Sequence, residues 1–236
     1  MIAMFMGPMN PYWLITIPGI LLALGAQWRL RSAYRRYSEM GTQLGLSGTQ
    51  TARLILDRNG LHDIEVHEVP GELSDHYDPT KRIVCLSPGI ARGNSIASVG
   101  VAAHEVGHAL QYQQNYAPVG LRMALVSVTG FASQAAGLIV MGGMILRGAF
   151  GQKMLMAGIL LFSVVAFFQL VTLPVEYDAS NRAKRELNRL GVVTADEAPA
   201  VSSMLHAAAL TYVAALIAAL LEVLQWILLA RNRNRE

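Results

Sequence analysis

Four apolar stretches constrain the fold of this chain more than any other feature of its sequence. They lie at about 12–27, 124–146, 154–173 and 207–230. A helix needs about 20 apolar residues to cross the hydrocarbon core of a bilayer. Hydrophobic residues make up 53% of the chain and charged residues only 15%, against about 25% charged in a typical soluble domain. The sequence therefore predicts a mainly α membrane protein with three to four transmembrane helices.

The first and last of these stretches are the least regular. The first has no basic region before it and no small-residue cleavage pattern after it, so it is predicted to be an anchor rather than a removed signal peptide. The last contains Glu222 and Gln225. These residues fit either a span with a buried polar face or a partly interfacial helix. Whether 207–230 crosses the bilayer therefore stays open at this point.

Two polar stretches alternate with the apolar ones and divide the chain into five predicted parts. These are an N-terminal anchor, a long polar part, a transmembrane hairpin, a polar helix with a loop, and a C-terminal apolar helix with a basic tail, at 1–30, 31–118, 119–173, 174–206 and 207–236. The long polar part predicts a small α+β domain. Capping, alternation and turn signals indicate a helix after Ser47, strands at 64–69 and 82–87, and a helix from Ile96 to about Gln113.

Positive charges are unevenly placed around the apolar stretches. Two groups follow the first and third stretches, Arg29, Arg31, Arg35 and Arg36 in one and Arg182, Lys184, Arg185 and Arg189 in the other. The positive-inside rule then predicts that both polar stretches face the cytoplasm. Arg231, Arg233 and Arg235 disagree, because a fourth full span would carry them outside. Cations exceed anions only by 19 to 16, and their position indicates a membrane surface rather than nucleic acid as partner.

The segment His-Glu-Val-Gly-His at 104–108 matches the motif H-E-x-x-H. On a helix, His104 and His108 lie one turn apart on the same face, so both imidazoles can reach one ion at the usual zinc–nitrogen distance of about 2.0–2.1 Å. Glu105 follows the first histidine and can take a proton from a water molecule. Gly107 is expected to leave space near the metal. The motif predicts a catalytic zinc site rather than two surface histidines.

A third zinc ligand must come from elsewhere, because a catalytic zinc usually has three protein ligands and one open position. A longer motif with a further histidine two turns on is absent, since Gln111 and Asn115 stand near that place. The alternatives are a carboxylate or another histidine, namely His62, His67, His76 or His206. Glu176 is the best candidate, because it directly follows the third apolar stretch and is expected to open a helix at the membrane surface. The competing interpretation is an acid that stabilises the helix dipole.

Several segments together resemble one known family. They are 71–79, 86–88, 95–97, 102–111 and 176–180. Over nearly its whole length the chain is similar to bacterial membrane zinc metallopeptidases, the neutral zinc metallopeptidase or YugP-like family. It resembles more distantly the gluzincins of the CAAX-protease and heat-shock membrane-protease type. The resemblance implies a zincin-like catalytic domain in the bacterial inner membrane, with Zn²⁺ bound by His104, His108 and Glu176 and with Glu105 as the base.

The resemblance also implies contacts around the zinc site. An edge strand above the zinc helix should pair with the backbone of a peptide substrate, and 82–87 is assigned to it. In the wider gluzincin pattern, an Asp four residues after the glutamate ligand orients a ligand histidine. That position here is Ser180, whose hydroxyl can accept a hydrogen bond from an imidazole but carries no charge. Asp178 lies two residues after Glu176 and is expected to point largely away.

A peptidase also needs a donor for the oxyanion of its tetrahedral intermediate. His76 and Tyr77 are the candidates for this catalytic role, and Arg182 is a weaker one. The alternative is structural, since Asp75 and Asp78-Pro79 are turn formers and a tyrosine ring commonly packs in a core.

These observations favour a zinc-dependent endopeptidase that acts on membrane-associated or unfolded proteins at the cytoplasmic face. Two alternatives stay open. One is a zinc hydrolase of a non-peptide amide or of lipid-linked material. The other is an inactive zinc-bound membrane scaffold, against which the intact Glu105 argues.

Overall fold

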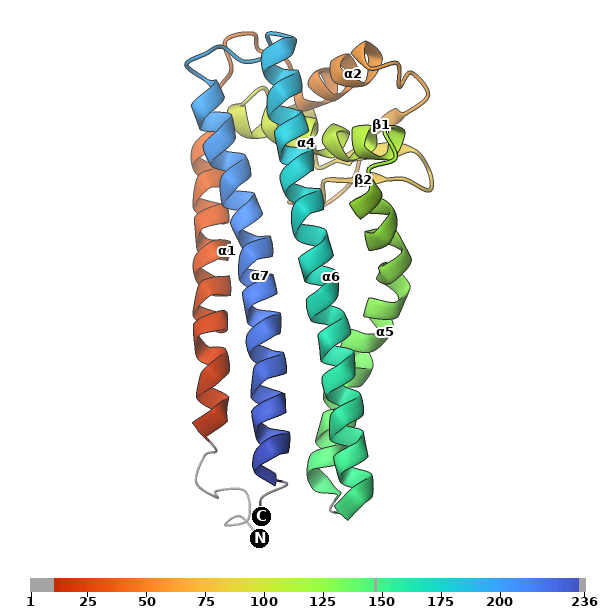
Figure 1. The fold of residues 1–236 in the computed structure, drawn as a ribbon. Coiled ribbons are helices and arrows are strands. Elements are labelled where there is room, and N and C mark those ends of the chain that lie inside the picture. Colours follow the sequence, from red (N-terminus) through yellow and green to blue (C-terminus); the bar gives the residue numbers. More distant parts are fainter. Residues whose placement is uncertain (1–10, 147, 234–236) are drawn as a thin grey trace. The chain divides into compact units, whose positions relative to one another are not determined.

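The computed structural model describes residues 11–146 and 148–233 (Figure 1). Residues 1–10 of the predicted anchor and Arg235 of the basic tail therefore lie outside the described residues. After a short 3-10 helix, Pro11–Thr16, the elements are α1 Ile17–Ser38, α2 Gly48–Arg58, β1 Glu65–Glu68, β2 His76–Asp78, β3 Ile83–Leu86, α3 Pro88–Arg92, α4 Ile96–Gln113, α5 Ala117–Ile145, α6 Gly148–Arg189 and α7 Ala198–Arg233. This content confirms the predicted fold class, a mainly helical membrane protein with a small α+β part.

The chain forms two compact units. The first, which we call the apolar unit, comprises Met1–Ala26, Leu121–Thr172 and Thr211–Glu236. The second, which we call the polar unit, comprises Gln27–Gly120 and Leu173–Leu210. Helices α6 and α7 each contribute residues to both units. All the predicted site residues belong to the polar unit.

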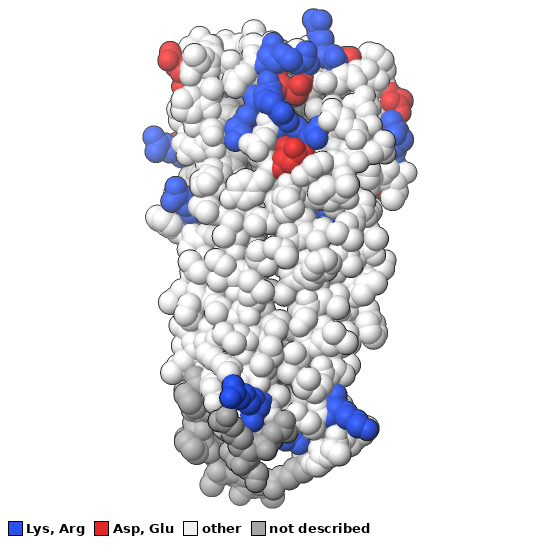
Figure 2. All heavy atoms as spheres, viewed as in Figure 1, with Lys and Arg blue, Asp and Glu red and all other residues white. Residues whose placement is uncertain are grey.

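Three of the described helices, α5, α6 and α7, are long and apolar enough to cross a membrane. Only 22%, 28% and 22% of their most apolar windows are buried inside the protein, so most of these side chains are left for contact with lipid. Figure 2 shows the long helices of the apolar unit without charge over most of their length on the face drawn. Helix α1 is not one of the three, because its second half carries the four arginines that follow the first apolar stretch.

Helix α6 runs without a break through Pro174, so the predicted helix end at that residue is wrong. Glu176 consequently lies inside a long helix and not at the start of one. A proline in a helix interior removes one backbone hydrogen bond, which costs about 3 kcal/mol. Burial of the following turns opposes this cost, because Val175, Ala179 and Ala183 are at most 1% exposed.

The polar unit is built from a small sheet, the helices α2 and α4 and the adjoining parts of α6 and α7. As predicted, Ser47 caps α2, and it does so through a reciprocal capping box with Gln50. Ser95 caps α4. Most of α4 is buried, and its small and aliphatic side chains form the centre of the core. The helix that carries the H-E-x-x-H motif is therefore held on several sides by the core.

The sheet corrects one prediction. Its strand order is β1-β3-β2, with β1 parallel and β2 antiparallel to β3. Segment 82–87, which contains β3, is therefore the central strand and cannot be the edge that pairs with a substrate. The error arose because His76–Asp78 has the composition of a turn, yet it pairs with Cys85, Val84 and Ile83. The edge strands of this sheet are β1 and β2.

One of the C-terminal arginines that disagreed with the charge rule has a local role in the apolar unit. The Arg233 guanidinium donates hydrogen bonds to the backbone carbonyls of Gly143 and Leu146. These carbonyls lie at the C-terminal end of α5, where helical carbonyl groups lack partners within the helix. A cation also interacts favourably with this end of the helix dipole. Arg233 thus caps helix α5. Because this local contact accounts for its position, Arg233 is weaker evidence against the orientation that the positive-inside rule predicts.

Candidate metal centre

Helices α4 and α6 bring three possible metal ligands together in the polar unit. His104 and His108 lie one turn apart on α4, with ring centroids separated by 4.8 Å. Glu176 of α6 faces both, since its Oε2 lies 3.3 Å from His104 Nε2 and 3.5 Å from His108 Nε2. The ligand atoms of these three residues all lie within 4.8 Å of one another. The structure thus joins the motif to the carboxylate selected from the sequence.

These separations fit a zinc ion. Tetrahedral coordination at about 2.0–2.1 Å keeps neighbouring ligand atoms about 3.3–3.4 Å apart. Two imidazoles and one carboxylate are also a donor set that catalytic zinc sites use. The side chain of Glu176 is only 3% exposed, whereas those of His104 and His108 are 15% and 13% exposed. The residues present can therefore hold the metal and still leave it accessible on the histidine side.

The pKa shifts of Glu176 and His108 favour a negatively charged carboxylate at this site, which can bind a cation. Burial alone would raise the pKa of Glu176, but hydrogen bonds from His104 and His108 hold it well below its ordinary value. Burial alone would lower the pKa of His108, but its hydrogen bond with Glu176 and the charge of that group raise it. The Glu176 carboxylate is therefore ionised, as a metal ligand must be.

Gly107 explains how α6 comes close enough to α4. A Cβ atom at this position would lie 2.5 Å from the backbone oxygen of Ala179 and 3.1 Å from its carbonyl carbon. Ala179 is one turn after Glu176 on α6. The glycine thus makes room for the backbone of α6, and not for the metal as we expected. This close approach is what allows a carboxylate on α6 to reach imidazoles on α4.

Glu105, the predicted base, lies on α4 between the two histidines. Its side chain belongs to the core-facing part of the helix, and the residue is 8% exposed. It is not one of the three clustered ligands. A carboxylate next to a metal, but not bound to it, can accept and return a proton.

The hydroxyl of Ser180 lies 3.1 Å from Nδ1 of His104, the ring nitrogen that faces away from Glu176. A partner at this nitrogen selects the tautomer of the imidazole and orients its ring for metal binding. Ser180 is buried and lies on α6, one turn after Glu176. It thus occupies the place from which the sequence pattern suggested it could orient a ligand.

His108 has a corresponding partner that the sequence analysis missed. Its Nδ1 lies 3.0 Å from Oε1 of Gln111, which is fully buried. The amide nitrogen of Gln111 donates to the backbone oxygen of Val175 at 2.7 Å and to Asp178 Oδ2 at 2.9 Å. Asp178 therefore does not point away from the site but connects to His108 through Gln111. The available signal was spacing, because Gln111 lies three residues after His108 and so on the same helix face.

Asp178 is held in turn by Arg182, whose Nε donates to Oδ2 at 2.5 Å. The same guanidinium bonds to Gln114 and lies over the ring of Tyr116, 5.7 Å from its centroid. These contacts indicate that Arg182 holds Asp178 in place. They also occupy its guanidinium, which makes Arg182 a poor candidate for stabilising an oxyanion.

The other predicted site residues lie outside the cluster of three. His76 and Tyr77 belong to β2, where His76 is exposed and bonds to the backbone oxygen of Ser74. Tyr77 packs edge-on against Tyr112 of α4, with ring centroids 5.6 Å apart. The remaining histidines considered as ligands are engaged elsewhere: His62 with Asp57, His67 with Glu65, and His206 in a groove between α6 and α7.

Replacing Gln111 with Leu is expected to weaken zinc binding by about 10–100-fold, the usual cost of losing a residue that orients a metal ligand. Leucine fills a similar volume but leaves Nδ1 of His108 without its acceptor. Zinc affinity can be measured by chelator competition on purified protein, with circular dichroism to verify folding. The matched control is Gln113→Leu on the same helix, since the Gln113 side chain is exposed and donates to the Asn59 backbone oxygen, away from the metal centre. Equal zinc affinity in both variants would contradict the role of Gln111.

Comparison with known proteins identifies a matching family and a similar protein. A family model described as "Putative neutral zinc metallopeptidase" matches residues 12–231. A protein of Bacillus subtilis described as "Putative membrane protease YugP" is 44% identical over 222 residues, which cover 94% of this chain and 97% of that protein. No solved structure matches the chain.

Proposed function

This chain belongs to the neutral zinc metallopeptidase family, and we propose that it is a membrane endopeptidase of the gluzincin type that cleaves membrane-associated or unfolded proteins. One observation carries the proposal. His104, His108 and Glu176 present three ligand atoms within 4.8 Å of one another, and the carboxylate oxygen lies 3.3 and 3.5 Å from the two imidazole nitrogens, close to the separation in a tetrahedral zinc site. Glu105 adds a carboxylate that is not one of those ligands but directly follows the first of them.

A zinc ion held by these three residues would supply Lewis acidity, which polarises a peptide carbonyl and makes a water molecule more acidic. Glu105 holds that water and accepts its proton as the water oxygen bonds to the carbonyl carbon. The protonated Glu105 then gives the proton to the peptide nitrogen, and the carbon–nitrogen bond breaks. Ser180 and Gln111 keep the two imidazoles oriented throughout.

Strand β2 is our revised choice for the edge that binds an extended substrate, because β3 is central in the sheet. Successive side chains of a strand point to opposite faces. The ring contact with Tyr112 turns Tyr77 toward α4, which favours Tyr77 over His76 as donor to the oxyanion. Burial raises the pKa of Tyr77, so its hydroxyl keeps the proton that this role requires.

The cytoplasmic side is our proposed location for the active site. Arginines follow the first apolar stretch, and a second group of cations follows Glu176 on α6. By the positive-inside rule, both groups favour the cytoplasm for the polar unit. The contact of Arg233 with the end of α5 supports this assignment, because it accounts for one of the charges that argued against it.

Metal removal tests the proposed function. We expect the purified protein in detergent to contain about one zinc ion per chain, as a single catalytic site requires. The chelator 1,10-phenanthroline should stop the cleavage of unfolded casein, and added zinc should restore it. Zinc without cleavage would favour a non-peptide amide substrate or a scaffold role. Protein without zinc after purification in zinc-containing buffer would overturn the assignment of the ligands.

A further inference from the structure

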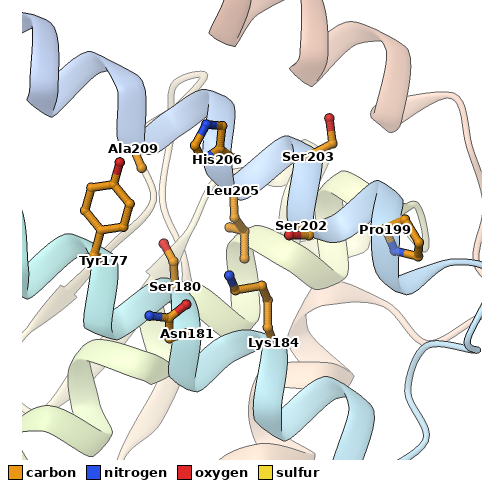
Figure 3. A pocket seen from close by; sticks show the side chains of 10 residues that line it. All are labelled: Tyr177, Ser180, Asn181, Lys184, Pro199, Ser202, Ser203, Leu205, His206 and Ala209. Atoms are coloured by element: carbon orange, nitrogen blue, oxygen red, sulfur yellow. The ribbon is translucent and has the colours of Figure 1, made fainter.

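A groove separates α6 from α7 within the polar unit, beside the metal centre but not part of it. Its volume is about 450 Å³. Figure 3 shows the lining side chains coming from two facing helices, with Tyr177, Ser180, Asn181 and Lys184 on α6 and Ser202 and His206 among those on α7. Two helices in contact normally fill the space between them with apolar side chains. Polar groups around an open volume suggest that the groove binds a ligand.

The chemistry of the lining favours an anion. Lys184 contributes a positive charge, and in Figure 3 its side chain extends from α6 toward α7. Hydroxyl, amide and imidazole groups from the other lining residues can donate hydrogen bonds. None of the described residues that line the groove is acidic. An anion with several oxygen acceptors would satisfy this set of donors and would be attracted by Lys184, whereas a cation would be repelled by that charge with no acidic lining residue to offset it.

The lining residues lie close in sequence to two apolar stretches, and this position favours one class of anion. Tyr177 comes four residues after the apolar stretch that ends at Leu173, and His206 directly precedes the stretch that begins at Ala207. Tyrosine at the ends of membrane-spanning helices typically lies at the level of lipid headgroups. Lys184 lies 11 residues after Leu173 and so on the polar side of that level. A phosphate group that projects from the headgroup level into the groove would be held by Lys184 as a point charge.

A second hollow supports the central place of Lys184. It has a volume of about 330 Å³ and shares Lys184, Pro199 and Ser202 with the first. Lys184 thus borders both volumes, which together give space for more than a bare phosphate.

We propose that this groove binds a phosphate-bearing anion through Lys184, and that its ligand is the headgroup of an anionic phospholipid. The inference goes beyond peptidase chemistry. Binding here requires none of the proposed zinc ligands, although the lining residue Ser180 also lies within hydrogen-bond distance of His104.

Three soluble probes test the proposal on the full-length protein in detergent: dihexanoylphosphatidylglycerol, dihexanoylphosphatidylcholine and inorganic phosphate. At about ten times its dissociation constant, the phosphatidylglycerol should raise Tm by about 3 °C. The phosphatidylcholine should not raise it. The variant Lys184→Gln should lose most of this shift. Arg185→Gln is the matched control, because it removes a charge from the neighbouring residue of α6, which does not line the groove.

The Tm shifts of the two variants and three probes distinguish the possible ligands. A shift that survives in Arg185→Gln and disappears in Lys184→Gln supports the groove as the site. If inorganic phosphate alone produces the same Lys184-dependent shift, the site stands and free phosphate is its ligand. Equal loss of the Tm shift in both variants would mean attraction to a charged surface and would overturn the proposal. Equal Tm shifts with both lipids, or no Tm shift with any probe, would also overturn it.

Discussion

Replacing Glu105 with Gln is expected to lower kcat for peptide cleavage by about 10²–10⁴-fold, the usual contribution of a general base. Glutamine has nearly the same shape as glutamate but cannot accept a proton from water. Zinc content should stay the same, because Glu105 is not among the three clustered ligands. Casein cleavage and zinc content are measured on the same preparations of both proteins, the zinc by inductively coupled plasma mass spectrometry.

Glu39→Gln serves as the control for this substitution, because Glu39 is an exposed glutamate of the polar unit that contributes nothing to the site. It should retain both activity and zinc. If Glu105→Gln kept full activity with zinc bound, the base would have to be another group. If it lost zinc as well as activity, Glu105 would have a structural or ligand role that our interpretation does not include.

Replacing Gly107 with Ala is expected to disrupt the metal centre without removing any ligand. The added Cβ would lie 2.5 Å from the backbone oxygen of Ala179, so α4 and α6 must move apart. Overpacking of this kind costs about 1–3 kcal/mol of stability. Separation of the helices draws Glu176 away from both imidazoles, and zinc affinity should fall at least about 10-fold. Chelator competition and thermal unfolding measure the two effects.

Gly120→Ala is the matched control. Gly120 is also helical and belongs to the same unit, but a Cβ there would meet nothing within 4 Å. Alanine favours a helix over glycine by about 1 kcal/mol, so this variant should be at least as stable as the natural protein and should bind zinc normally. Normal zinc affinity in Gly107→Ala would show that the helices tolerate the separation and that the close approach is not needed for the site.

Local patterns account for much of what could be predicted. The spans follow from apolar length, and α2 and α4 follow from the capping residues Ser47 and Ser95. His104 and His108 are four residues apart, so they lie on the same face as soon as their segment is helical. Glu176 was selected from its position after an apolar stretch, although the expected helix start was wrong. These features can be predicted because each depends on residues close together in the chain.

Other features depend on contacts between distant segments. The turn-like segment at 76–78 becomes an edge strand only because β3 lies beside it, and β3 is thereby excluded as the edge. Pro174 stays within α6 because the following turns are buried in the polar unit. Gln111, which stands near the place of an absent third histidine, instead joins His108 to Asp178 on a different helix.

The sequence by itself determined which side chains have the chemistry for a metal site, two imidazoles and a neighbouring carboxylate on one predicted helix. Glu176 could be selected from the sequence as the best candidate for a third ligand, but only the tertiary structure places its carboxylate beside both imidazoles and shows which groups contact those rings. The physical reason is distance. A periodic pattern reports the faces of a single helix, whereas the approach of α6 to α4 depends on how the backbone at Ala179 packs against a glycine 72 residues earlier in the chain.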